Sequence, residues 1–283
     1  MPTIRYHEPL NVLVVAKGHP YLRDPFMAIF DEMEGVSGML VEQPAAQRLM
    51  SIDGMKGFDA LVLYDMPGLD FQAPDRPGYV EPSSEFKENL LALLDNGTGV
   101  VALHHALAGW PAWPAYAELL GGRFLYKPGS LRGQQRPDSG YRHDVTHTVT
   151  PVQTDHPVLD GIEFPMTLTD ELYLAEAFDD SIEPLLVSDH KFVRDGFYSA
   201  AQAVAGRMFS NEGWQHPDGS NLVGWVKRAR RSPLVYLQPG DGPATYGLPG
   251  YRRLIRNAIR WVASDAARAW ARTGAAKKTN RTL

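Results

Sequence analysis

Short apolar runs alternate with amphipathic segments along the first half of the chain. Four runs have the length and apolar character of buried parallel strands, namely residues 11–16, 39–42, 58–65 and 99–103. Two segments between them repeat apolar residues at helical spacing, with Phe26, Ile29, Phe30 and Met33 in the first and Phe86, Leu90, Leu93 and Leu94 in the second. This alternation of strands and helices predicts an α/β fold built on a doubly wound, mostly parallel sheet.

Helix-ending residues agree with this pattern. Asp24 is the predicted N-cap of the first helix, with Pro25 at its first position, and Gly97 is the predicted stop of the second. A further helix is expected over residues 114–120, because Gly121 and Gly122 follow it directly.

Between residues 123 and 231 the chain no longer shows the alternation of buried strands and amphipathic helices. Residues 141–149 alternate between apolar and polar side chains, which predicts a strand with one face toward water. We interpret residues 123–231 as an antiparallel extension of the same domain. A last buried strand is expected over residues 232–237, followed by a helix that packs on the sheet. The prediction is one domain over residues 1–271 and a loosely ordered basic tail over residues 272–283.

Composition narrows the functional classes. The chain has 283 residues, of which 44% are hydrophobic, enough for one large domain. It contains no cysteine, which excludes disulfides, thiolate metal sites and a cysteine nucleophile. The net charge of −5 comes from well-mixed acidic and basic residues, so neither nucleic acid nor a membrane surface is an expected partner. The expected partners are small neutral molecules or proteins. With no leader-like segment at its start, the protein is expected to be cytoplasmic.

Ionisable residues follow four of the predicted strands. His104 and His105 come directly after the run at residues 99–103, and His19, Asp65 and Asp241 stand at or after the ends of three others. Because ligands bind at the carboxyl ends of strands in open α/β sheets, these residues are candidates for one site. Each also has a plainer interpretation, since His19 and Asp241 suit turns and Asp65 suits a cap. Adjacent residues point in different directions, so one of the two histidines is expected to face the pocket.

Further candidates come from a pair of acids and from aromatic residues. Asp170 and Glu171 lie in an otherwise apolar strand, and alternation is expected to turn only one of them inward. We favour Glu171 as the functional acid, with an ordinary surface acid as the alternative. The tryptophans, including Trp110, are expected mostly in the core, although one flat ring beside a polar pocket would suit the face of a sugar.

The residue types limit the chemistry of this candidate site. His104 stands where a hydrolase of this topology places its nucleophile, and no nucleophile is present there. Proton transfer, metal-assisted chemistry and simple binding remain. No nucleotide-binding motif is found, and the cofactor is unknown. A divalent metal is chemically reasonable, but no ligand spacing supports one, so no metal ligand is predicted.

Several segments together resemble the trehalose-utilisation ThuA-like family. They are residues 99–106 with Trp110, residues 119–124, residues 155–158 with Gly161, residues 170–173, and residues 253–261. The resemblance implies a flavodoxin-like, class I glutamine amidotransferase-like fold in which a histidine replaces the cysteine. It also implies a role in carbohydrate catabolism, beside sugar dehydrogenases that form 3-keto-sugars. The chain departs from the family pattern at Asp241, where similar proteins have a histidine.

These observations lead to one main hypothesis and two alternatives. The main hypothesis is an enzyme acting on a sugar or 3-keto-sugar, with His104 or His105 as general base and Glu171 as acid partner. His19, Asp65, Trp110, Tyr173 and Asp241 would bind the substrate. The alternatives are a non-catalytic module that binds a sugar or a partner, and a metal-dependent hydrolase. A homodimer is compatible with the long loops.

Overall fold

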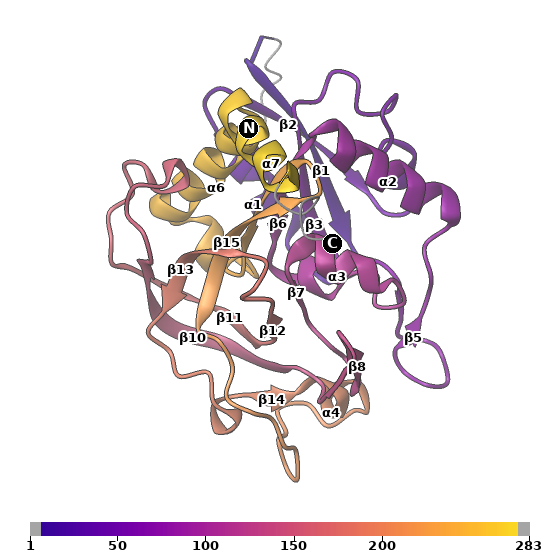
Figure 1. Cartoon of the computed structure of the whole chain (residues 1–283). Helices are drawn as coiled ribbons and strands as arrows, with labels where there is room; N and C mark the ends of the chain where they lie inside the picture. The colour runs from indigo at the N-terminus through magenta and orange to yellow at the C-terminus, as the bar shows by residue number, and fades with distance from the viewer. Residues whose placement is uncertain (1–6, 277–283) are drawn as a thin grey trace.

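A ten-stranded sheet organises the part of the chain that the computed structural model describes, residues 7–276 (Figure 1). One half of the sheet is parallel. In spatial order it consists of β2 (Val36–Glu42), β1 (Leu10–Lys17), β3 (Ala60–Asp65), β6 (Gly99–Leu103) and β16 (Ser232–Leu237). Each pair of neighbours in this half runs parallel, which confirms the doubly wound α/β core.

Helices cover both faces of the parallel half. Side chains of β1 alternate between two hydrophobic clusters, with Val12 and Val14 in one and Leu13 and Val15 in the other. The first cluster includes residues of α1 (Arg23–Asp31) and α6 (Pro249–Val262), and α7 (Asp265–Ala276) packs beside α6. The second includes residues of α2 (Ser84–Asn96) and α3 (Pro114–Leu120). The sheet is therefore buried on both sides, as its continuous apolar runs require.

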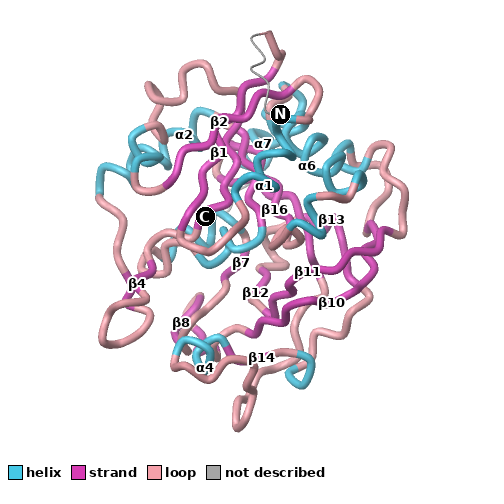
Figure 2. Tube along the Cα trace, turned by 180° about the vertical axis from the view of Figure 1, so that it is seen from behind, coloured by secondary structure: helices cyan, strands magenta, loops and turns pink. Residues whose placement is uncertain are grey.

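The antiparallel extension continues the same sheet from β16. Its strands are β15 (Leu222–Ala229), β13 (Glu183–Ser188), β10 (Gly140–Pro151) and β11 (Met166–Leu174), with β14 (Tyr198–Ser199) paired to β10. Figure 2 shows these strands from behind, with β10, β11 and β14 below the parallel strands. In β10, Val145, His147 and Val149 are buried while Thr146 is exposed, so the alternation predicted over residues 141–149 is confirmed from residue 145 onward.

Short elements complete the fold. The strands are β4 (Leu69–Asp70), β5 (Gly78–Tyr79), β7 (Gly122–Arg123), β8 (Gly129–Leu131), β9 (Gln134–Arg136) and β12 (Glu176–Ala177). The α-helices are α4 (Ala200–Val204) and α5 (Pro243–Tyr246). The 3-10 helices span Ala45–Arg48, His104–Ala108, Pro157–Leu159 and Arg194–Gly196.

The helix ends agree with those predicted from the sequence, except at the start of α1. Gly97 closes α2 with a φ of 93°, and α3 ends at Gly121 in the same left-handed conformation. Asp24, however, is not the N-cap of α1. The helix begins at Arg23 with Leu22 as an uncapped N-cap, so Asp24 lies inside the first turn. There its charge interacts favourably with the helix dipole.

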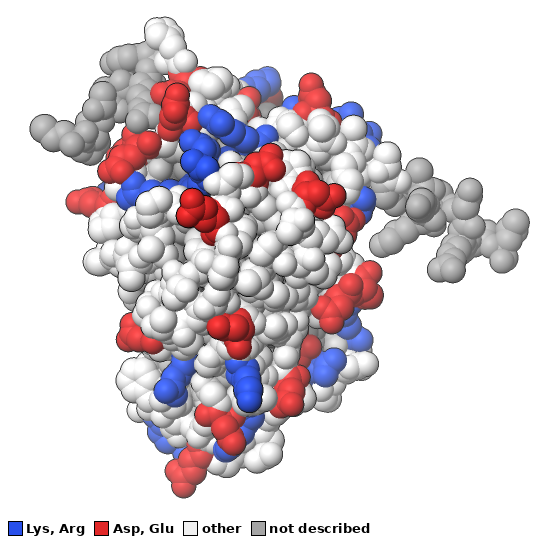
Figure 3. Space-filling view, turned by 90° about the vertical axis from the view of Figure 1, so that its left-hand side faces the viewer, with Lys and Arg blue, Asp and Glu red and all other residues white. Residues whose placement is uncertain are grey.

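The carboxyl-terminal region is helical beyond the expected domain end. Helix α7 includes residues 272–276, and the rest of the predicted tail, residues 277–283, lies outside the described residues. None of the described helices is long and apolar enough to cross a membrane. On the face that Figure 3 shows, acidic and basic side chains are interspersed.

Candidate functional site

His104 lies at the centre of the site, at the turn between β6 and a 3-10 helix. Its φ is +44°, and its side chain is fully buried. Nδ1 donates to the Gln238 carbonyl oxygen at 2.6 Å, and Nε2 lies 3.0 Å from Glu171 Oε2 and 3.5 Å from Asp241 Oδ1. Burial opposes a charge on this ring, but the hydrogen bonds and charges of Asp241 and Glu171 raise the pKa of His104 to about 10. His104 is therefore an imidazolium at neutral pH.

His105 is directed elsewhere. The two adjacent rings are nearly perpendicular, at 81°. Its Nε2 lies 3.0 Å from the Tyr64 carbonyl oxygen, and its ring stacks on His19 with centroids 4.6 Å apart. Burial holds the pKa of His105 well below its usual value, so this ring is neutral. His105 supports His19 from behind.

Strand β11 contributes both members of its acid pair. Glu171 lies on the cavity side, and Tyr173 on the same side places its hydroxyl 2.8 Å from His104 Nε2. Asp170 accepts hydrogen bonds from the backbone N–H groups of Gly240 and Asp241, at 2.6 and 3.0 Å. The expectation that only one of the two acids turns inward is wrong, because both faces of β11 are covered and both carboxylates are buried.

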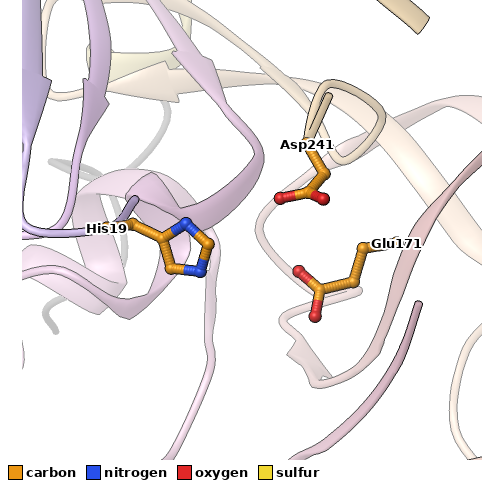
Figure 4. Close-up of side chains that lie close together, drawn as sticks. All are labelled: His19, Glu171 and Asp241. Atoms are coloured by element: carbon orange, nitrogen blue, oxygen red, sulfur yellow. The ribbon is translucent and has the colours of Figure 1, made fainter. Parts of the chain in front are cut away.

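His19 and Asp241 close the site from two loops that follow β1 and β16. Figure 4 shows both side chains directed toward Glu171, and one ligand atom from each of the three lies within 4.8 Å of the others. His19 Nδ1 contacts the Pro20 carbonyl oxygen at 2.9 Å, and burial lowers the pKa of His19. Burial alone would raise the pKa of Asp241, but its hydrogen bond to charged His104 holds that pKa below the usual range.

A cavity of about 390 Å³ opens onto this group. His19, Glu171 and Tyr173 belong to its wall, together with His143 of β10. The remaining lining residues are mostly aromatic or aliphatic, and include Met66, Phe71, Phe124, Tyr126, Tyr141, Ala200, Ala203, Val204 and Met208. A mostly apolar wall with a few convergent polar groups is the usual composition of a small-molecule site.

His143 is a site residue that the sequence reasoning missed. A bulge in β10 between Arg142 and Val145 leaves two residues opposite Glu171, and His143 Nδ1 lies 3.4 Å from Glu171 Oε1. Since the bulge adds one residue, His143 and Val145 do not share a face as strict alternation would require. Asp144, within the bulge, has a left-handed backbone with a φ of 55°. Aspartate tolerates this conformation, but an aspartate alone does not predict a bulge from the sequence.

Of the eight predicted site residues, His19, Glu171 and Tyr173 line the cavity, and His104, His105 and Asp241 adjoin them. Asp65 and Trp110 lie apart from this group. Asp65 is buried beneath the sheet edge, where Gln43 Nε2 donates to it at 2.7 Å. Burial raises the pKa of Asp65 to about 7. Trp110 packs against Phe86 with ring centroids 5.3 Å apart. The structure therefore brings together His19, His104, Glu171, Tyr173 and Asp241, with His105 behind them.

Comparison with known families gives one match over most of the chain. The model of the ThuA family, described as trehalose utilisation, matches residues 11–262. No curated protein matches the chain.

Comparison with solved structures gives several matches to the fold. ThuA-like proteins from Parabacteroides merdae and Bacteroides uniformis each give a TM-score of 0.57, at 14% and 16% identity. The match to the Parabacteroides merdae protein covers 90% of this chain and 90% of that protein. The match to the Bacteroides uniformis protein covers 94% of this chain and 96% of that protein. PurLQS from Thermotoga maritima gives a TM-score of 0.50 at 11% identity, covering 89% of this chain and 99% of that one. These similarities confirm the predicted amidotransferase-like α/β fold.

Proposed function

This chain belongs to the ThuA family of trehalose utilisation, and from that premise we propose that it is a cytoplasmic enzyme acting on a sugar or a 3-keto-sugar. The observation that carries the proposal is the cavity. Its aromatic wall ends on a histidine and a carboxylate that face each other, His143 and Glu171. A binding module needs polar groups but has no need of a proton-transfer pair.

The cavity wall suits a sugar. Tyr126, Tyr141 and Tyr173 present ring surface that complements the apolar C–H face of a pyranose. His19 and Asp241 would contact hydroxyl groups at the inner end. We propose these residues as the substrate-binding set, in place of Asp65 and Trp110.

We assign proton transfer to His143 and Glu171. His104 has no access to a ligand in the cavity because its side chain is fully buried and both its ring nitrogens are engaged. His143 lines the cavity, and the Glu171 carboxylate beside Nδ1 favours the tautomer in which Nε2 carries the lone pair. The buried imidazolium of His104 holds Glu171 in place. In this proposal His104 is a positioning residue.

The reaction that this pair supports is enolisation next to a ketone. His143 would take the proton from the carbon adjacent to the carbonyl, and the electron pair of that C–H bond would form an enolate. If the carbon that lost its proton carries a hydroxyl, transfer of the hydroxyl proton to the enolate oxygen and return of the other proton to the former carbonyl carbon gives the isomeric ketone. Alternatively, the enolate expels the glycosidic oxygen, the C–O bond breaks, and protonated His143 donates its proton to the leaving oxygen. A sugar dehydrogenase is the class of enzyme that would supply the ketone.

Hydrogen exchange tests this assignment independently of the final product. The protein is incubated in deuterated water with the 3-keto derivative of trehalose, and loss of the C–H signal next to the carbonyl is followed by NMR. His143→Gln and Glu171→Gln are expected to lower the enzyme-dependent exchange rate at least about 100-fold, the usual contribution of general base catalysis.

His7→Gln is the matched control, because His7 is exposed and removed from the cavity wall. It should exchange at the wild-type rate. Wild-type exchange in His143→Gln would refute the assignment. Saturable sugar binding with neither exchange nor product would instead establish the binding module.

A further inference from the structure

We infer that His19, Glu171 and Asp241 bind one divalent cation at the inner end of the cavity. The three side chains come from the loop after β1, from strand β11 and from the loop after β16, and they converge on one point (Figure 4). One imidazole and two carboxylates form a donor set that suits Zn²⁺, Mn²⁺ or Fe²⁺. The sequence shows no ligand spacing because each ligand lies on a different element.

The two carboxylates are held in the manner of metal ligands. His104 Nε2 contacts one oxygen of each, Glu171 Oε2 and Asp241 Oδ1. Neither second oxygen contacts His104: Glu171 Oε1 faces His143 Nδ1 at 3.4 Å on the cavity side, and Asp241 Oδ2 is the other carboxylate atom that a cation could take. Asp170 fixes the backbone of Asp241 through the N–H group of that residue. Such supporting bonds orient the ligands of metal sites and are part of the site.

His19 shows an independent sign of ligand geometry. Its Nδ1 contacts the Pro20 carbonyl oxygen, and its ring stacks on His105. A backbone carbonyl bonded to one ring nitrogen fixes the tautomer and leaves the other nitrogen as the ligand, which is the usual arrangement of a metal-binding histidine. Nε2 of His19 is therefore the nitrogen for the cation.

The position of the site gives the cation access to substrate. His19 and Glu171 line the cavity, so a cation with three protein ligands would keep a coordination position open toward it. Open positions distinguish catalytic from structural zinc sites. The ligands this position would take are neighbouring oxygens of a sugar, such as a carbonyl and an adjacent hydroxyl. Atoms about 2.1 Å from a tetrahedral Zn²⁺ are about 3.4 Å apart, and the three ligand atoms here lie within 4.8 Å of one another.

Metal binding is measured on the full chain without a histidine tag, after removal of metals with a chelator. Equilibrium dialysis against Zn²⁺ and, separately, Mn²⁺ is followed by elemental analysis. We expect one equivalent per chain for at least one of the two cations. His19→Gln and Asp241→Asn should each raise the dissociation constant at least 10-fold, because removal of a group that merely supports a ligand already costs about that much.

His7→Gln removes a histidine from the exposed surface and should bind as the wild type does. Circular dichroism confirms that each variant is folded, and His19→Gln changes only a partly exposed loop residue. Failure of the wild type to bind either cation would overturn the inference, as would wild-type affinity in both variants.

The outcome is separable from the proposed function. Stoichiometric metal without hydrogen exchange would refute the acid-base proposal and leave the metal site intact. Exchange by the metal-free protein, together with no bound equivalent of either cation in dialysis, would refute the metal site and leave the acid-base proposal intact.

Discussion

At the scale of single residues, His104 shows how a strained position is stabilised. A φ of +44° is uncommon for a residue with a large side chain, and such conformations cost roughly 1–3 kcal/mol. Hydrogen bonds from both ring nitrogens offset this cost, and the Tyr236 hydroxyl donates to the His104 carbonyl oxygen at 3.0 Å. The sharp turn after β6 thus directs an imidazole into the site at the position where related topologies carry a nucleophile.

Asp170 gives a prediction at this scale. Its carboxylate accepts bonds from the backbone N–H groups of Glu171, Gly240 and Asp241, all in buried or partly buried positions. Asp170→Ala would leave these donors without an acceptor, so the free energy of unfolding should fall by at least about 2 kcal/mol. Urea unfolding measures the change. Asp53→Ala, which removes an exposed ion pair with Lys56, should leave the free energy of unfolding close to that of the wild type. Equal effects of the two substitutions on the free energy of unfolding would show that Asp170 does not stabilise the loop after β16 that contains Gly240 and Asp241.

At the scale of elements, the bulge in β10 decides which side chains reach the site. Tyr141 pairs with Tyr173 on the cavity side, whereas beyond the bulge Val145 pairs with Asp170 on the opposite side. One inserted residue therefore turns the same strand from lining the cavity to filling the core. Without it, His143 and His147 would lie on one face.

The buried part of β10 predicts a pH dependence of stability. Burial lowers the pKa of His147 to about 4, while the unfolded chain has an ordinary histidine pKa near 6.5. As pH falls from 6.5 to 4, the unfolded state gains a proton that the folded state does not bind, so stability is lost over this window. In His147→Gln that loss should be smaller by on the order of 2 kcal/mol. Unfolding free energies at pH 7.5, 5.5 and 4.5 measure it. Parallel pH curves for the two proteins would contradict the prediction.

At the scale of the whole molecule, the parallel and antiparallel halves of one sheet form the site together. The parallel half supplies His19, His104 and Asp241 at its carboxyl edge, and the antiparallel half supplies Glu171 and His143. Helices pack on both faces of the parallel half, and the two hydrophobic clusters between the layers hold its strands in position. The site therefore depends on the close contact of the layers.

Gly99 tests that contact. A Cβ atom at this position would lie 2.2 Å from the Val262 carbonyl oxygen at the end of α6, so α6 and β6 would have to separate. Gly99→Ala should lower the free energy of unfolding by more than about 2 kcal/mol, which is within the usual cost of overpacking. At Gly129 the nearest atom to such a Cβ is 3.9 Å away, and Gly129→Ala should change stability by less than about 0.5 kcal/mol. Thermal and urea unfolding compare the two. A stable Gly99→Ala protein would show that the layers tolerate separation.

The sequence by itself determined the elements and one edge of the sheet. Apolar runs fixed the parallel strands, glycines fixed the ends of α2 and α3, and the order of strands and helices fixed the doubly wound core. The rule that ligands bind at the carboxyl ends of strands then located His19, His104 and Asp241 correctly on one edge. These features depend on neighbours within a few residues, which a sequence displays.

Only the tertiary structure decided the charge, exposure and partners of these side chains. His104 is a buried imidazolium because Glu171 and Asp241, 67 and 137 residues away in the chain, face its Nε2. His143 lies at the cavity beside a bulge in β10 that no residue type in the sequence predicts. Asp65 lies outside the cavity wall, where its carboxylate accepts a hydrogen bond from Gln43. The charge state of these side chains and their access to the cavity depend on contacts between segments that are far apart in the chain. The periodicity of apolar residues does not show which distant segments come into contact.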